Sequence, residues 1–211
     1  MQKMLRRKAG ALALAAIGAG LAAAAPPAGA QAAEALKVLD RDHILGKREA
    51  PITIIEYASL TCPHCAHFAT TTFPKIRKDL IDTGKVRWVY RDFLWDGVAL
   101  KAAMLAHCMP ADQFFTIVDV LFVSQDQWST AANPSAALSQ IGRTAGLDQP
   151  TIDKCLTDDA MKKKIVTRIQ DGEKLYGMKS TPTFIINGKA ESGDMDYDTF
   201  YNLVKDLLPK A

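Results

Sequence analysis

Cys62-Pro63-His64-Cys65 places two thiols three residues apart, and the segments on either side of this motif indicate the architecture. The preceding segment, 52–57, is a near-continuous apolar run that predicts a buried β-strand. The following segment, 66–80, predicts a helix, which Pro74 should kink or restart. A strand, a short turn and a helix that opens on Cys-x-x-Cys is typical of a redox-active dithiol.

The first cysteine of the pair falls at the N-terminus of the predicted helix. Unpaired backbone N–H groups and the positive end of the helix dipole point at Cys62 there, and both favour a thiolate over a thiol. The thiolate is the form that attacks disulfides. Pro63 suits the first helical turn, because its missing N–H would have had no partner in any case.

Residues 1–30 have the features of a secretory signal peptide: a basic start, an apolar run over 9–25, and Ala28-Gly29-Ala30 as a cleavage site. The basic residues are Lys3, Arg6, Arg7 and Lys8. A membrane anchor is the alternative, but the run is rich in Ala and Gly, is followed by Pro26-Pro27 and is shorter than about 20 residues. We therefore expect cleavage and export to the periplasm, where disulfides persist.

Removal of the signal peptide changes the charge balance. Of the 26 basic and 23 acidic residues, four basic and no acidic residues lie in 1–30, so 22 basic and 23 acidic residues remain. This balance leaves no basic surplus for binding nucleic acid or an anionic membrane. The remaining length of about 181 residues is enough for one core, or for a core with an inserted subdomain.

The rest of the sequence divides by periodicity. Residues 31–49 contain a short apolar patch that is compatible with an edge strand, and 85–93 alternate as a strand does, with Arg87 and Arg91 on a solvated face. From 96 to 176 the period is helical. Helices are expected at 98–108, 110–123, 134–145, 149–156 and 158–176, followed by a strand at 183–186, a turn at Asn187-Gly188, a return strand at 189–192 and a helix at 198–208.

Glu56 is an acidic residue within the apolar strand, six positions before Cys62. One interpretation is a buried carboxylate that relays a proton for the cysteines. The other is an acid on a partly exposed face, or one paired with a lysine, because buried acids are uncommon unless paired. The spacing alone does not separate the two.

Thr181-Pro182 directly precedes the strand at 183–186, where a cis bond is plausible because it costs an X–Pro bond only about 0.5–1 kcal/mol. A cis proline there would expose the backbone of Thr181 as an edge for an extended peptide. The alternative is an ordinary trans proline at the start of a strand.

Cys108 and Cys155 are the second cysteine pair, 47 residues apart in the helical segment, and neither belongs to a Cys-x-x-Cys. An oxidising compartment favours a structural disulfide between them. Two buried free thiols are the alternative. His107, beside Cys108, is expected to serve packing or to lie on the surface rather than to react.

Together these features resemble the DsbA-type thiol:disulfide oxidoreductases, in the branch with a second cysteine pair. The resemblance covers about residues 52–208. It rests on Glu56, Cys62-Pro63-His64-Cys65, Thr83-Gly84-Lys85-Val86, a helical insertion with Cys108 and Cys155, the stretch 177–184 and Asn187-Gly188.

The resemblance implies an α/β protein with a thioredoxin-like fold and an inserted all-helical subdomain. Residues 31–95 and 177–211 would form the thioredoxin-like domain, and 96–176 the insertion. In the active site it implies a cis Pro182, Cys62 as the nucleophile, Cys65 as its buried partner and His64 as a stabiliser of the Cys62 thiolate. Some members of the family carry Val where Thr181 stands here, so we expect the Thr181 hydroxyl to alter the redox poise.

The resemblance also implies the partners. The expected substrates are reduced, unfolded exported proteins, and the expected oxidant is a quinone-linked membrane thiol oxidase of the DsbB type. The active group is the redox-active disulfide itself, with no further cofactor and no metal. The expected state is a monomer that binds no nucleic acid.

Two other functions remain open. A disulfide isomerase or reductase of the same fold would require a dimerisation domain or a reducing partner. We expect no additional dimerisation domain in this sequence. A metal-binding module could use Cys62, His64, Cys65 or His67, but structural zinc wants four convergent ligands. Ala66 follows the motif where c-type haem attachment requires His.

Overall fold

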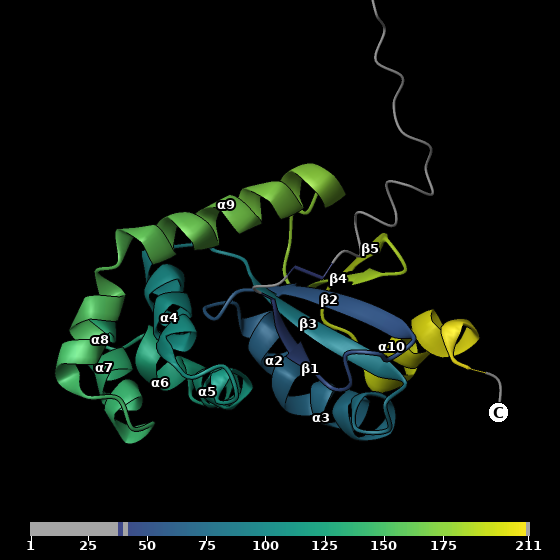
Figure 1. Ribbon diagram of the computed structural model, residues 1–211, viewed down its shortest axis with the longest axis horizontal. Helices are drawn as coiled ribbons and strands as arrows, with labels where there is room; N and C mark the ends of the chain where they lie inside the picture. Colours follow the sequence, from purple (N-terminus) through teal and green to yellow (C-terminus); the bar gives the residue numbers. More distant parts are fainter. Residues whose placement is uncertain (1–37, 40–41, 210–211) are drawn as a thin grey trace, which may run out of the picture.

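The computed structural model describes residues 38–39 and 42–209, so the predicted signal peptide lies outside the described residues. Within them a five-stranded mixed sheet has the order β1-β3-β2-β4-β5 (Figure 1). The strands are β1 (His43–Leu45), β2 (Ile52–Ala58), β3 (Val86–Asp92), β4 (Thr183–Ile186) and β5 (Lys189–Ser192).

The central strand, β2, leads directly to the dithiol. It runs parallel to β3 and antiparallel to β4, with Glu56 opposite Tyr90 on one side and Phe184 on the other. All seven residues of β2 are buried, which explains why its sequence is a continuous apolar run rather than an alternating one.

The helices fall into two groups. Those that follow β2 or β5 are α2 (Pro63–Thr71), α3 (Phe73–Ile76), the π-helical turn η1 (Arg77–Ile81), α10 (Tyr197–Val204) and the 3₁₀ turn η2 (Lys205–Leu207). Those between β3 and β4 are α4 (Gly97–Cys108), α5 (Phe114–Val123), α6 (Gln125–Ser129), α7 (Pro134–Thr144), α8 (Gln149–Leu156) and α9 (Asp159–Tyr176). In Figure 1, α9 runs along one side of the sheet, α2 and α3 lie on the other, and α4 to α8 gather beyond its end.

The two faces of the sheet bury different sets of side chains. On one face Phe68 of α2 and Phe200 of α10 pack with Trp88, at ring-centroid distances of 6.3 and 5.8 Å. On the other face Ile169 of α9 and Met104 of α4 belong to a second cluster. The sheet is therefore covered on both sides, as expected for a thioredoxin-like α/β fold.

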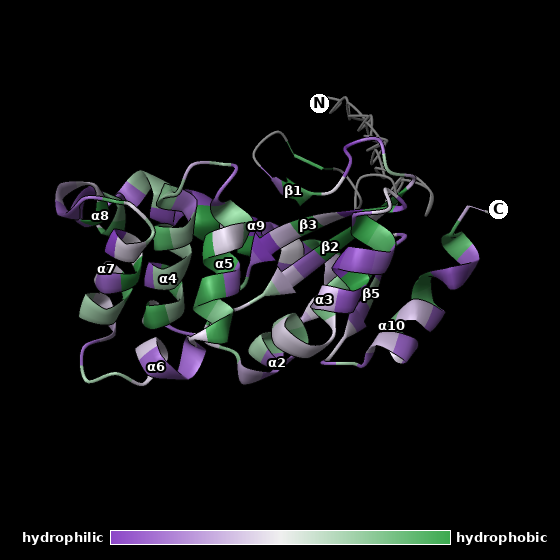
Figure 2. Cartoon of the chain, turned by 90° about the horizontal axis from the view of Figure 1, so that it is seen from below, coloured by the Kyte–Doolittle hydropathy of each residue, from purple (hydrophilic) through white to green (hydrophobic). Residues whose placement is uncertain are grey.

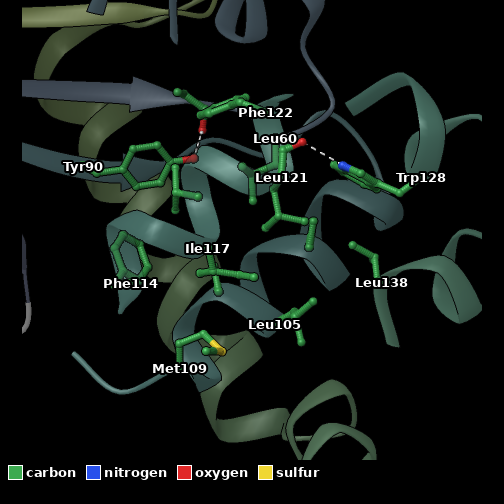
Figure 3. Packing of buried hydrophobic residues seen from close by; sticks show 14 of the residues in the cluster. Leu60, Tyr90, Leu105, Met109, Phe114, Ile117, Leu121, Phe122, Trp128 and Leu138 are labelled. Carbon is green, nitrogen blue, oxygen red and sulfur yellow. Dashed lines mark hydrogen bonds between the residues drawn. The ribbon is translucent and has the colours of Figure 1, made fainter. Parts of the chain in front are cut away.

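A third cluster joins the dithiol to the helical segment. It contains both active-site cysteines together with side chains of α4, α5, α6, α7 and α8 (Figure 3). Figure 2 shows that α4 and α5 are predominantly hydrophobic, which fits their central place in this cluster. The chain thus has a thioredoxin-like fold with an inserted all-helical subdomain, while the division at residues 96 and 176 stays a prediction.

Arg91 was expected on a solvated face, and this prediction is wrong. Its side chain is buried, its Nη2 donates to Asp42 Oδ2 at 2.8 Å, and its Nη1 donates to the Tyr57 hydroxyl at 2.9 Å. The carboxylate comes from the segment just before β1, which lies against β3 at the sheet edge. Alternation along one strand could not reveal that this distant segment covers Arg91.

Among the described residues, none of the helices combines the length and the apolar character that a membrane span requires.

Candidate active site

Cys62 is the N-cap of α2, so its sulfur lies where the first N–H groups of the helix are free. Its backbone N–H donates to the Ser59 carbonyl at 3.0 Å, which closes the turn between β2 and α2. Pro63 occupies the first helical position, and Cys65 lies one turn further, facing the core. The buried central strand and the start of α2 thus hold the dithiol at the end of β2.

The surroundings of Cys62 lower its pKa to about 5. The largest cause is a hydrogen bond from the Cys65 thiol; the Thr181 side chain and the backbone N–H groups of Cys65 and His64 act in the same direction. Burial opposes them, since only 9% of Cys62 is exposed. These donors all favour the thiolate, so Cys62 is poised as a nucleophile and as a leaving group.

Cys65 has the opposite character. Its side chain is fully buried, and burial raises its pKa well above the ordinary value for a thiol. The neighbouring Cys62 and the Glu56 carboxyl raise it further. At neutral pH one sulfur of the pair is therefore a thiolate and the other a thiol.

The segment before β4 forms the other wall of the site. The Thr181–Pro182 bond is cis, and the Thr181 carbonyl oxygen lies 3.5 Å from the Cys62 sulfur, where it can accept a hydrogen bond when Cys62 is a thiol. The Pro182 carbonyl accepts from the Gly193 N–H at 2.9 Å, which ties this segment to the end of β5. Residues 119 positions apart in the sequence thus meet at the nucleophile.

Two further residues at the site were missed from the sequence. Trp95 is 54% exposed, and its indole N–H donates to the Thr181 hydroxyl at 2.9 Å. Gln125, at the start of α6, is buried, and its amide donates to the carbonyls of Leu60 and Cys62 at 2.8 and 3.0 Å. Neither residue carries a motif, so only the tertiary contacts reveal them.

Glu56 is buried, as one of the two interpretations required, and does not lie on a partly exposed face. Its Oε2 accepts a hydrogen bond from the Trp88 indole at 3.1 Å, while Oε1 has no hydrogen-bond partner among the described residues. Burial raises the pKa of Glu56 to about 7. A carboxyl with this pKa gains and loses protons readily near neutral pH.

The side chain of His64 is exposed at the second position of α2. Its backbone N–H is one of the groups that lower the pKa of Cys62. A contribution of its imidazole to the thiolate stays a prediction.

The second cysteine pair lies in the helical segment between β3 and β4. Cys108, the last residue of α4, is joined to Cys155 of α8 by a disulfide, with their Cα atoms 6.1 Å apart. Next to it, His107 Nε2 lies 2.6 Å from Asp92 Oδ2, and His107 Nδ1 lies 3.2 Å from a nitrogen of His43. His107 is thus part of a half-buried packing contact between β3, α4 and β1, in line with its expected role.

In the part of the chain that the structure describes, no three His, Cys, Asp or Glu side chains are grouped in a way that could hold a metal ion.

Comparisons with known proteins agree with this geometry. The sequence matches the family profile described as thioredoxin over residues 39–206. It is 32% identical over 173 residues to a protein of Rickettsia conorii named as a protein-disulfide oxidoreductase. The alignment covers 82% of this chain and 62% of that protein. The chain therefore spans less than two thirds of the length of this relative. A disulfide bond formation protein D of Bacillus subtilis is 28% identical over 169 residues, 78% of this chain and 76% of the relative.

Solved structures of disulfide-exchange proteins also superpose on this chain. The crystal structure of alpha-DsbA1 from Wolbachia pipientis superposes with a TM-score of 0.77 and 34% identity, over 82% of this chain and 94% of that chain. The structure of oxidised BdbD from Bacillus subtilis has a TM-score of 0.70 at 24% identity and shows the shared fold.

Proposed function

This chain belongs to the thioredoxin family, in its DsbA-type branch of protein-disulfide oxidoreductases, and from that membership we propose that it introduces disulfides into exported proteins. The observation that carries the proposal is the contrast between the two active-site sulfurs. Cys62 favours the thiolate, and Cys65 is buried and favours the thiol. A pair of this kind is easily reduced, and so it oxidises other thiols.

The first step begins with the oxidised Cys62–Cys65 pair. A thiolate of a reduced substrate attacks the Cys62 sulfur, a new bond forms between substrate and Cys62, and Cys65 leaves with the electron pair of the broken disulfide. The Thr181 backbone, beside Cys62, is a suitable edge for the extended substrate peptide. Cys65 then takes a proton, and Glu56 is the acid proposed to supply it.

The second step releases the product. A second substrate thiolate attacks the substrate sulfur of the mixed disulfide, and Cys62 leaves as a thiolate. This departure is favoured because the hydrogen bonds to Cys62 lower its pKa to about 5. The substrate is then oxidised and the enzyme reduced by two electrons.

We propose that the protein acts in the periplasm, as a monomer, after removal of residues 1–30. Its substrates are reduced, unfolded exported proteins. A membrane thiol oxidase of the DsbB type, linked to quinones, reoxidises Cys62 and Cys65. This proposal follows the family and the predicted signal peptide.

Substitution of each active-site cysteine tests the proposal. With a reduced two-cysteine peptide as substrate, Cys62→Ser should abolish oxidation. With the disulfide-linked dimer of a one-cysteine peptide, Cys65→Ser should accumulate a mixed disulfide, because the Cys62 thiolate attacks the peptide disulfide, releases one peptide thiolate and cannot be displaced by residue 65. Mass spectrometry detects the adduct. Cys108→Ala with Cys155→Ala is the control and should still oxidise the peptide. Oxidation by Cys62→Ser at the wild-type rate would show that the mechanism is wrong.

A further inference from the structure

The buried sulfur of Cys65 needs a route for protons. Under the proposed function, Cys65 gains a proton each time it leaves as a thiolate, and loses it each time it attacks the mixed disulfide that reoxidises the enzyme. Its side chain has no exposed surface, so bulk water does not reach it. Glu56 acts electrostatically on Cys65, but it is 5% exposed and buried as well. A proton on Glu56 therefore still has to reach the solvent.

A narrow cavity begins at Glu56. It offers about 10 Å³ for the centre of a water molecule, which is room for about one water. Aromatic rings form most of its wall: Phe68, Phe73, Trp88, Tyr90, Phe115 and Phe122. Glu56 Oε1, which has no partner among the described residues, would receive a hydrogen bond from a water in this cavity.

Asp119 is the second carboxylate that lines the cavity. It is the single charged residue of α5, whose sequence is otherwise apolar except for Thr116. Its side chain is 45% exposed, and Arg77 Nη1 lies 3.6 Å from its Oδ2. Partial burial raises the pKa of Asp119, and Asp119 in turn raises that of Glu56, so the two carboxyls interact. The Glu56 carboxylate thus lies at the buried end of the cavity, and the Asp119 carboxylate is exposed to solvent.

We propose that Asp119 is the outer carboxylate of a proton path that runs from Cys65 through Glu56 and one water to the solvent. The inference rests on the proposed function and adds a residue of the helical insertion to the chemistry of the dithiol. Arg77 holds the Asp119 carboxylate at the mouth of the path.

The protons balance in both directions. During substrate oxidation Glu56 gives its proton to the departing Cys65 thiolate, and the Glu56 carboxylate recovers one from solvent through Asp119 and the water. During reoxidation Cys65 gives its proton to Glu56 and attacks the Cys62 sulfur, which expels the thiolate of the oxidant. That proton then passes through the water to Asp119 and to solvent.

The test uses the reduced protein and Ellman's reagent, an aromatic disulfide, in stopped flow. The first phase is attack by Cys62, which releases one coloured thiolate, and the second is attack by Cys65 on the mixed disulfide, which releases another. Asp119→Asn should leave the first phase unchanged and slow the second about tenfold near neutral pH. Added formate, a small carboxylate, should restore the second phase, because it replaces the missing proton acceptor.

Matched variants exclude a structural effect. Asp119→Glu should keep the wild-type rate, and Arg77→Gln, which breaks the ion pair but keeps the carboxylate, should slow the second phase far less than Asp119→Asn. Asp126→Asn, an exposed acid on the next helix, should change nothing. In Glu56→Gln, adding Asp119→Asn should cause no further slowing.

Different results would contradict the proton path through Asp119 and the proposed oxidase function. A normal second phase in Asp119→Asn, with a slow one in Glu56→Gln, would overturn the route through Asp119 and leave the oxidase function standing. If formate does not restore the second phase of Asp119→Asn, the route through Asp119 would also be wrong. Absence of the first phase in the wild-type protein would instead contradict the role of Cys62 itself.

Discussion

A thiolate at Cys62 depends on donors of three kinds, from two segments of the chain. Backbone N–H groups come from the first turn of α2, a thiol comes from Cys65, and a hydroxyl comes from Thr181. The hydroxyl is itself held by the indole N–H of Trp95, which leaves its own hydrogen free to point elsewhere. The Thr181 side chain lowers the pKa of Cys62, so we expect Trp95 to act on Cys62 through Thr181.

The first prediction is a double-mutant cycle on this chain of donors. The pH midpoint of Cys62 alkylation by iodoacetamide should be about 5 in the wild-type protein. Thr181→Val should raise it by about one unit, since a hydrogen bond to a charged group is worth about 1.5 kcal/mol and one pKa unit is about 1.4 kcal/mol. Trp95→Phe should raise it by less, and should have no effect when Val already replaces Thr181.

Additive shifts in the double variant would contradict this coupling. Peptide mapping of the alkylated protein is the control: Cys62 should be labelled at mildly acidic pH, while Cys65 is spared.

At the scale of single residues, the sequence predicts those whose role follows from local spacing. Cys62, Cys65 and Pro63 belong to one motif, and Thr181-Pro182 precedes a recognisable strand, so their places could be anticipated. The burial of Glu56 could not be decided, because it depends on the helices that pack over β2. Trp95, Asp119 and Gln125 have no local signature, and their roles arise from contacts across the fold.

At the scale of elements, α6 links the helical insertion to the active site. Its first residue, Gln125, holds two carbonyls of the turn that carries Cys62. The amide supplies the donor of the buried Leu60 carbonyl and a second donor, beside the Ala66 N–H, to the Cys62 carbonyl. The insertion therefore supports the dithiol directly as well as adding hydrophobic core.

The second prediction removes this link. Gln125→Met keeps the approximate shape of the side chain but leaves the buried Leu60 carbonyl without its donor and removes one of the two donors to the Cys62 carbonyl, so the free energy of unfolding should fall by about 2 kcal/mol. Urea unfolding measures the loss. Gln127→Met, an exposed position on the same helix, should stay within about 0.5 kcal/mol of the wild type. Equal stability of both variants would show that Gln125 does not support the turn.

The elements were predictable to different degrees. The strand at 183–186, the return strand at 189–192 and the helix at 149–156 agree with the structure residue by residue, because turn and cap signals bound them. The edge strand is formed by His43–Leu45, which at three residues is too short to show an alternating pattern and is fixed by its pairing with β3. The short α6 was not anticipated, since five residues give no periodicity.

At the scale of the whole molecule, the two cysteine pairs should affect stability in opposite directions. The Cys62–Cys65 loop is too short to restrict the unfolded chain much, and its reduction creates a thiolate that the fold stabilises. The Cys108–Cys155 disulfide closes a loop of 47 residues and joins two helices of the insertion. Its removal by substitution of both cysteines with Ala should lower the free energy of unfolding by up to about 4 kcal/mol.

The third prediction is that the protein with a reduced active site is more stable than the protein with an oxidised one, and that the difference depends on pH. The pKa of Cys62 is about 5 in the folded protein and about 8.5 in an unfolded chain. The thiolate contribution is therefore complete above pH 8.5, partly present at pH 7, and lost as pH falls through 5.

Urea unfolding of both redox forms at neutral and strongly acidic pH checks this. An oxidised form that is clearly more stable at neutral pH would rule out a strong oxidant, and would point to a reductase.

The disulfide between α4 and α8 makes each copy of this protein a product of the chemistry proposed for it. If the chain is exported as proposed, it arrives with four reduced cysteines, and Cys62 and Cys65 precede the pair that has to be joined. A finished copy is the catalyst suited to making that bond in a new one. Under the proposed function, maturation would then be autocatalytic: the first molecules would be oxidised slowly, and each completed molecule would speed the oxidation of the next.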